Sequence, residues 1–281
     1  MTDGRLDIMN MVERMPAFPI SVHRVVELTS DINADPKELV AIIEHDPVLL
    51  MRILKLANSP YFRLSQKITS VNHAVVIVGF NTVKNMALSI AAIGVLRLKT
   101  KSGFDMEGFL LHSLSTATIA RLFAKNMRVP TKASFDYFLS GLLHDYGKIV
   151  FAHFKPLDFQ RALIMAREKG IPLHEAEKEI FNIDHAQVGS ILGEKWNLPS
   201  NLLDVMKTHH SQDCARPLLT DVVSASNQIG KELKIGEGGN PVMEKIPDQI
   251  TGMFGADVEG IVGALGDVRG EIEQAMVFAT M

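Results

Sequence analysis

Helix-start and helix-stop signals follow one another along most of the chain, while the alternating pattern of a half-buried β-strand is nearly absent. Asp35 precedes Pro36, and Glu38 follows three residues after the aspartate, a combination typical of a capped helix start. Asp46 and Pro47 repeat the signal before apolar residues at helical spacing. The sequence therefore predicts an all-α fold.

The same signals set the expected helix boundaries. Residues 75–78 are β-branched and favour a strand by propensity, but Ser70 before them and Gly79 after them favour a buried helix. Asn81 is the expected cap of the helix that follows. We expect helices at residues 48–57, 71–78, 82–98, 106–127, 135–151, 157–169, 173–181, 185–196, 199–209 and 220–233, then a loop at 236–241 and a helical tail.

A polar, glycine-containing break at residues 99–103 is the expected boundary between two lobes. We place an N-terminal helical lobe at residues 15–100, a second lobe at 101–235 and a C-terminal helical extension at 236–281.

Composition limits the compartment and the partners. A hydrophobic content of 47% with 22% charged residues excludes large-scale disorder, and a net charge of −3 gives no overall attraction to nucleic acid. Cys214, the single cysteine, cannot form an internal disulfide and fits a reducing compartment. Residues 1–14 lack the apolar core of a signal peptide, and the most apolar stretch, 86–96, is shorter than the ~20 residues of a membrane span. We expect a cytoplasmic protein without a membrane segment.

A His144-Asp145 pair lies inside the segment GLLHDYGK at residues 141–148. Adjacent helical residues point ~100° apart, yet an imidazole nitrogen and a carboxylate oxygen can converge on one ion between them. We expect Gly147 to end the helix and to let Lys148 reach a phosphate. The ordinary alternative is a capping aspartate beside a surface histidine.

Four further histidines occur where a metal site would need them. His112 begins a run of small residues that can pack closely on the helix of His144, and Gly189 follows His185 by one helical turn. His209 and His210 end a helix, where they could also serve its dipole. Singly, His112 and His185 also fit ordinary buried positions. Jointly, neutral imidazoles with one aspartate suit a divalent Fe, Mn, Co, Ni or Zn ion.

This spaced series resembles the HD phosphohydrolase superfamily in its HD-GYP-like arrangement. In the first lobe, residues 15–19 (MPAFP) are similar to the opening P-x-x-P segment of the HDOD domain, the HD-related output domain of bacterial signalling proteins. Residues 46–59 look like its DP…LLxLANS signature, and residues 74–79 and 189–199 match further blocks. The resemblance covers roughly residues 15–233, and we place the domain at 15–235.

The resemblance implies an all-α regulatory domain, with an HD-like second lobe, in a family without established hydrolase activity. We therefore expect a non-catalytic signalling module that acts through protein partners, with a vestigial or single-metal site. The GYP tripeptide of cyclic-di-GMP phosphodiesterases is absent after His210, where residues 211–216 read SQDCAR. HD enzymes hold metal with a late helical aspartate, and the matching position here is Asn227. Asp221 lies ~240° around that helix and should face away.

Two other functions stay open. A metal-dependent phosphohydrolase acting on a nucleotide or cyclic dinucleotide would use Asp145 and Lys148 in catalysis, Lys148 steadying the phosphate, and hold its metals with the residues His112, His144, Asp145, His185, His209 and His210. Residues 72–88 have some helix-turn-helix spacing, but Lys84 and a few flanking side chains are too little positive charge, which disfavours nucleic acid as a partner.

Overall fold

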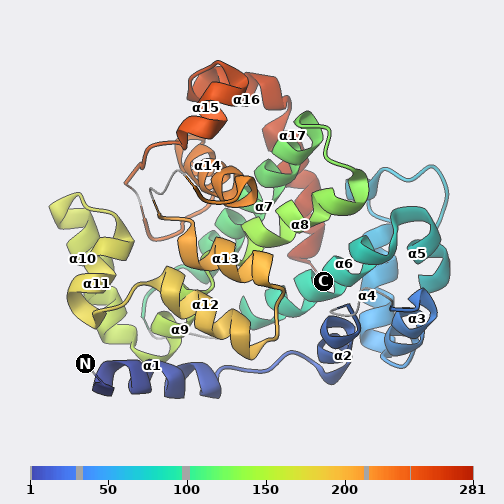
Figure 1. The fold of residues 1–281 in the computed structure, drawn as a ribbon, viewed down its shortest axis with the longest axis horizontal. Coiled ribbons are helices and arrows are strands. Elements are labelled where there is room, and N and C mark those ends of the chain that lie inside the picture. The colour runs from blue at the N-terminus through green and yellow to red at the C-terminus, as the bar shows by residue number, and fades with distance from the viewer. Residues whose placement is uncertain (1, 30–33, 97–101, 212–214, 241, 281) are drawn as a thin grey trace.

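A computed structural model describes residues 2–29, 34–96, 102–211, 215–240 and 242–280. Every regular element in these residues is an α-helix or a short 3-10 helix, and none is a β-strand. The all-α prediction is confirmed (Figure 1). Cys214 lies outside the described residues.

The helices of the expected first lobe form the right-hand part of the molecule in Figure 1. Its elements are α2 (Ile20–Thr29), α3 (Pro36–Glu44), α4 (Pro47–Ala57), η1 (Pro60–Phe62), α5 (Val71–Val78) and α6 (Phe80–Leu96). The expected caps are present, because Asp35 and Asp46 accept hydrogen bonds from backbone N–H groups of α3 and α4. Ser70 likewise accepts from the N–H of His73, so the β-branched segment is helical as predicted.

The start of α6 corrects one prediction. The helix begins at Phe80, so Asn81 lies in its first turn instead of capping it. The reason is Gly79, whose φ of 93° turns the chain while its carbonyl accepts from the N–H of Val83. The expected end at residue 98 falls outside the described residues.

The second lobe contains the helices that position the histidines. They are α7 (Met106–Asn126), α8 (Thr131–Leu143), α9 (Gly147–Phe154), α10 (Pro156–Lys169), α11 (Leu173–Phe181), α12 (His185–Lys195), α13 (Ser200–Thr208) and α14 (Leu218–Glu232). Helices α7 and α8 cross closely, since a Cβ on Gly141 would lie 2.7 Å from the Cα of Ala117. This crossing brings His112 on α7 to the end of α8.

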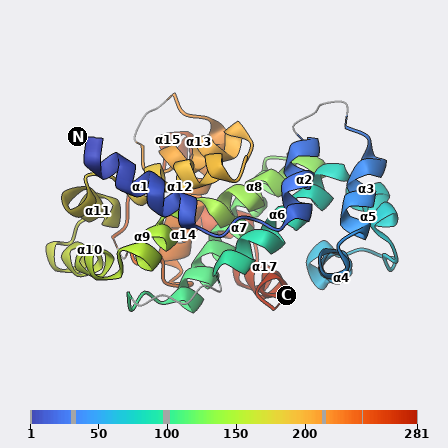
Figure 2. The same ribbon diagram turned by 90° about the horizontal axis from the view of Figure 1, so that it is seen from below.

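Both chain ends return to this lobe. The first helix, α1 (Thr2–Arg14), lies beside α9 and α12 (Figure 2). The segment after α1 is fixed by Trp196, whose indole N–H donates to the Pro16 carbonyl at 3.2 Å and whose ring stacks on Phe18 at 4.3 Å. The C-terminal elements are α15 (Asp248–Phe254), α16 (Val258–Leu265), α17 (Val268–Ala275) and η2 (Met276–Phe278), and α17 packs on α7 and η1.

One cluster of buried apolar side chains extends from Ile8 to Phe278 and includes residues of both lobes. The expected lobe boundary at 99–103 lies largely in residues 97–101, outside the described ones, and stays a prediction. Among the described residues, no single helix is long and apolar enough to cross a membrane, although the pair α5 and α6, bent by 118°, meets the length and composition criteria together.

Candidate metal centre

The His-Asp pair lies in a sharp turn between two helices. Helix α8 ends at Leu143 and α9 begins at Gly147, so the prediction of one helix over 135–151 is wrong, as is the role of Gly147 as a helix end. Gly147 instead permits a close crossing with α12, because a Cβ there would lie 1.9 Å from the carbonyl oxygen of His185. Gly189, whose Cβ would lie 3.2 Å from the Gly147 nitrogen, provides the close approach expected of it.

Asp145 is the centre of the cluster, and its two carboxylate oxygens face different groups. Oδ2 lies 3.2 Å from the Nε2 atoms of His112 and of His144. Oδ1 lies 3.0 Å from Nε2 of His185 and 3.4 Å from Nε2 of His209. All five side chains are almost completely buried. The structure thus gathers them, with His210 beside His185, around one carboxylate.

The outer nitrogens of four rings are held in a common way. The Nδ1 atoms of His144 and His209 lie 2.8 and 2.9 Å from the carbonyl oxygens of Gly141 and Met206. Because a carbonyl can only accept, both Nδ1 atoms carry the proton and both Nε2 atoms present lone pairs.

Two carboxylates fix the Nδ1 atoms of the other two rings, those of His185 and His210. Glu177 accepts from Nδ1 of His185 at 2.5 Å, and Glu244 lies 3.1 Å from Nδ1 of His210. Carboxylates behind histidines are the usual outer partners of metal ligands, since they fix the tautomer and increase the basicity of the ring. The sequence analysis predicted a role for neither glutamate.

The donor set fits a metal ion. The Nε2 atoms of His144 and His209 and the Oδ1 atom of Asp145 are buried and have no hydrogen-bond partner among the described residues. Among the described residues, three groups have ligand atoms close enough to share an ion: Asp145 with His185, His209 and His210, Asp145 with His112 and His144, and His174 with His210 and Glu244. Unpartnered buried polar atoms cost free energy. An ion in the first group would satisfy His209 and Asp145, and one in the second would satisfy His144.

Among the six candidate ligands, charge is concentrated on Asp145 and His185. Burial raises the pKa of Asp145, but the neighbouring His144 and Lys148 outweigh it and hold that pKa well below its ordinary value. Burial lowers the pKa of His185, yet the adjacent Glu177 carboxylate prevails and raises it to about 9. Burial lowers the pKa of His112 to about 4, which keeps its ring neutral. The centre therefore offers one carboxylate and mostly neutral imidazoles.

Lys148 does not point to an open phosphate site. Its ammonium lies 2.5 Å from Oδ2 of Asp145 and donates to the carbonyl of Gly238 at 2.9 Å. Gly238 also lies against His112, because a Cβ there would be 2.9 Å from Nε2 of the ring. Residues 236–240 and Glu244, which we call the covering segment, thus close the centre from the C-terminal side.

Asn227 is buried on α14, and its Oδ1 has no partner among the described residues. Asp221, on the same helix, forms an ion pair with Arg216. Its carboxylate is therefore engaged away from Asp145.

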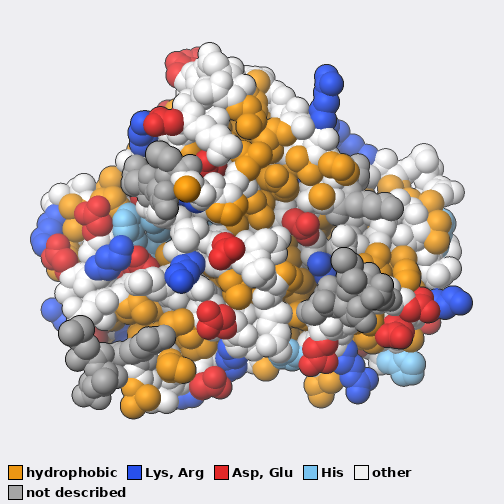
Figure 3. All heavy atoms as spheres, in the orientation of Figure 1, with side chains coloured by type: hydrophobic (Ala, Val, Ile, Leu, Met, Phe, Trp, Pro, Cys, Tyr) orange, Lys and Arg blue, Asp and Glu red, His pale blue; other side chains and the backbone are white. Residues whose placement is uncertain are grey.

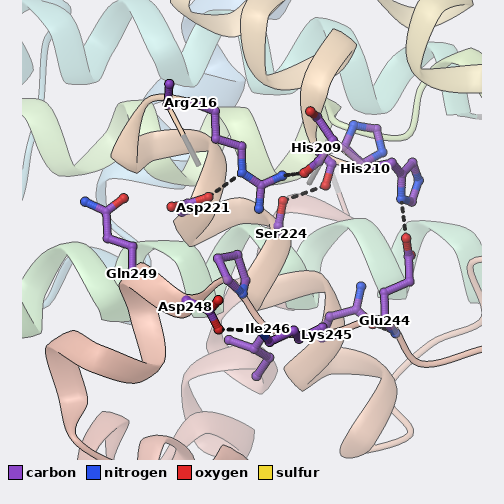
Figure 4. A pocket seen from close by; sticks show the side chains of 14 residues that line it. His209, His210, Arg216, Asp221, Ser224, Glu244, Lys245, Ile246, Asp248 and Gln249 are labelled. Atoms are coloured by element: carbon purple, nitrogen blue, oxygen red, sulfur yellow. Dashed lines mark hydrogen bonds and ion pairs between the residues drawn. The ribbon is translucent and has the colours of Figure 1, made fainter. Parts of the chain in front are cut away.

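A cavity of about 390 Å³ borders the outer side of the centre (Figure 4). His209 and His210 form one wall, and Ser224 donates to the carbonyl of His209 at 2.6 Å. The charged side chains around it neutralise one another, since Arg216 pairs with Asp221 and Glu244 lies between His210 and Lys231.

The fold and the site together define the class of this protein, an all-α domain built around a buried His-Asp turn. The HDOD domain family matches residues 15–212, and the chain belongs to that family. The covering segment and α14 lie beyond the matched residues, although they complete the centre.

Solved structures share the fold. An HDOD domain protein of unknown function from Geobacter sulfurreducens is 20% identical with a TM-score of 0.72, covering 97% of this chain and 98% of its own. A candidate phosphohydrolase from Shewanella amazonensis is 22% identical with a TM-score of 0.73, covering 97% of both chains. A candidate signal transduction protein from Marinobacter aquaeolei is 20% identical with a TM-score of 0.71, covering 99% of this chain and 65% of its own.

Curated relatives are longer. An uncharacterized protein of Treponema pallidum is 25% identical over 251 residues, which are 88% of this chain and 47% of the relative. The uncharacterized protein YuxH of Bacillus subtilis is 34% identical over 106 residues, 38% of this chain and 25% of the relative. The chain thus spans about half or less of the curated relatives it matches.

Proposed function

We propose that this chain is a non-catalytic signalling module that acts through a protein partner and holds one structural transition-metal ion at Asp145, His185, His209 and His210. The observation that carries the proposal is the covering segment. Gly238 lies on His112 and binds Lys148, and Glu244 holds His210. On the side of His112 and Lys148, the chain itself therefore occupies the position that a phosphate ester would need, while the cavity of about 390 Å³ borders the centre at His209 and His210.

The ligand types favour a borderline divalent ion of the series Fe, Mn, Co, Ni and Zn. When bound, such an ion would neutralise the charge of Asp145 and cross-link the turn between α8 and α9, the start of α12 and the end of α13. The group His112, His144 and Asp145 has three ligands, and its expected fourth position is the neutral Asn227. We therefore propose a single tightly bound ion.

The first lobe supplies a surface for the partner. Val48 and Met51 lie one turn apart on α4 with 61% and 67% of their surface exposed, and Val76 on α5 is 72% exposed. Large exposed apolar side chains on one lobe are typical of interaction sites. Nucleic acid is not favoured, because acidic and basic side chains are intermixed on the face shown in Figure 3.

Affinity purification of the tagged full chain, with mass spectrometry of the bound proteins, tests this function. We expect His144→Ala to retain its partner and the double variant Val48→Asp/Met51→Asp to lose it. Leu157→Asp is the matched control, since Leu157 is equally exposed on the second lobe at 73%. Loss of the partner in a folded His144→Ala variant would contradict the proposal.

The second candidate is a metal-dependent phosphohydrolase, favoured by the five histidines that surround Asp145, although Asn227 stands where HD enzymes carry an aspartate. Turnover of a cyclic dinucleotide or nucleotide phosphate, measured with Mn²⁺ or Fe²⁺ under reducing conditions, separates the two functions. Activity that Asp145→Ala abolishes would establish the enzyme, and its absence in a metal-loaded protein supports the signalling module.

A further inference from the structure

A second cavity, of about 260 Å³, lies far along α7 from the metal centre. It is formed where η1 of the first lobe meets α7, the first turn of α8 and α17 of the C-terminal extension. Arg121, which faces this cavity, follows His112 by nine residues, or about 13 Å of helix. None of its lining residues belongs to the centre described above. Its walls include Tyr61, Phe62, Arg63, Arg121, Lys125 and Glu271.

The charge of this cavity is unbalanced. It contains three cationic side chains and one carboxylate, and Glu271 is already bound to Arg63 at 2.6 Å. Arg121 and Lys125 form no ion pair with a carboxylate among the described residues. The larger cavity beside His210 differs, because its arginine and lysine are each paired with an aspartate.

Arg121 is positioned but not neutralised. Its guanidinium carbon lies 4.2 Å from the centre of the Tyr61 ring and 5.7 Å from that of Phe62. These cation–π contacts fix the side chain without using its hydrogen-bond donors on an anion. Lys125 lies one helical turn further on α7, so both cations project from the same face. A guanidinium that is held in place and not neutralised, with an ammonium group beside it, can bind a phosphate group.

We propose that this cavity binds a small organic monophosphate, with its phosphate at Arg121 and Lys125. The volume lies below the roughly 300–1,000 Å³ of typical ligand pockets, which favours a single phosphorylated sugar or similar molecule over a dinucleotide. The bound molecule would contact the first lobe, the second lobe and the C-terminal extension at once. This inference goes beyond the proposed function and does not depend on the metal centre.

Calorimetric titration of the full chain with ribose 5-phosphate, orthophosphate and ribose tests the site. The buffer contains a chelator, so that phosphate cannot bind through an ion at Asp145. We expect saturable one-to-one binding of ribose 5-phosphate, weaker binding of orthophosphate and none of ribose. Arg121→Gln and Lys125→Gln should each raise the dissociation constant about tenfold or more, as expected for a lost charge-assisted contact.

Arg161→Gln is the matched control, because Arg161 is exposed on α10, outside the cavity, and should leave binding unchanged. Lys125 is also exposed, so Lys125→Gln keeps the test valid if Arg121→Gln fails to fold. Absence of saturable binding up to millimolar ribose 5-phosphate, or equal affinity in wild type and Lys125→Gln, would overturn the proposal. Binding that Asp145→Ala removes and Lys125→Gln preserves would do so as well, by assigning the phosphate to the other site.

Discussion

The Nε2 atoms of His185 and His210 lie 3.0 Å apart, while the Nδ1 atom of each ring faces a glutamate. Two nitrogens at this distance must share either a proton or an ion. The buried and unpartnered Nε2 of His209 and Oδ1 of Asp145 favour an ion. The two outer carboxylates would therefore hold both rings with Nε2 directed at the proposed ion.

The first prediction concerns metal content. Purified protein should contain close to one transition-metal ion per chain by elemental analysis, and a chelator should lower its melting temperature, because an ion that binds only the folded state stabilises it. His185→Ala should abolish both effects, and His153→Ala, outside the ligand groups, should preserve them. A chain without metal after growth and purification in metal-replete conditions would contradict this expectation.

The second prediction concerns Glu177. Glu177→Gln keeps the shape of the side chain but removes the charge behind His185, so metal affinity should fall about 10- to 100-fold. Competition with a fluorescent chelator measures the change. Glu175→Gln, on the same helix but not among the buried side chains, is the control and should bind metal like wild type. Equal affinity in the Glu177 variant would show that this carboxylate does not support the ring.

The third prediction is a pH dependence of the metal-free protein. Glu177 raises the pKa of His185 from 6.5 to about 9, so the protonated ring binds its carboxylate more strongly when the chain is folded. This stabilisation is fully present below pH 6.5 and is lost as the pH rises through 9. In chelator, the melting temperature of wild type should exceed that of Glu177→Gln most near pH 6, and the gap should narrow by pH 9.5. A difference in melting temperature that does not change with pH would contradict this prediction.

The fourth prediction tests the helix crossing at the His-Asp turn. Gly147→Ala would force a Cβ onto the backbone carbonyl of His185 and should cost about 3 kcal/mol or more in the free energy of unfolding. Gly263→Ala is the matched control, since a Cβ there meets nothing within 4 Å and should stabilise α16 by about 0.5–1 kcal/mol. Denaturant unfolding of both variants measures the difference. A Gly147→Ala variant as stable as wild type would contradict a tight crossing at this position.

The fifth prediction concerns Asn227. Asn227→Asp adds a negative charge at the position where HD enzymes carry an aspartate, so the variant should bind more metal per chain than wild type. Elemental analysis after dialysis against limiting Mn²⁺ gives the ratio. Asp221→Asn is the control, because Asp221 is engaged by Arg216. An unchanged ratio would place Asn227 outside the reach of the ion.

Local signals predicted most helices, because each depends on neighbours in sequence. The caps at Asp46 and Ser70 are examples. The turn at Asp145 was missed, since the close crossing beside it is between Gly147 and the backbone of His185, some forty residues away in the sequence. The same limit hid Glu177. Glutamates are mostly exposed, so Glu177 was not named, although its helical phase with Leu173 and Ala176 on the buried face of α11 could have indicated a buried position.

The covering segment would affect how the centre acquires the proposed ion. All six His and Asp side chains precede residue 211, whereas Gly238 and Glu244 are synthesised later. At ordinary translation speeds this delay is roughly 2 to 7 s. During that interval the ligands can be present while the chain that closes over them is not. The identity of the ion would then depend first on which metal the cell has available when each molecule is made, and the segment that covers the centre would slow later exchange.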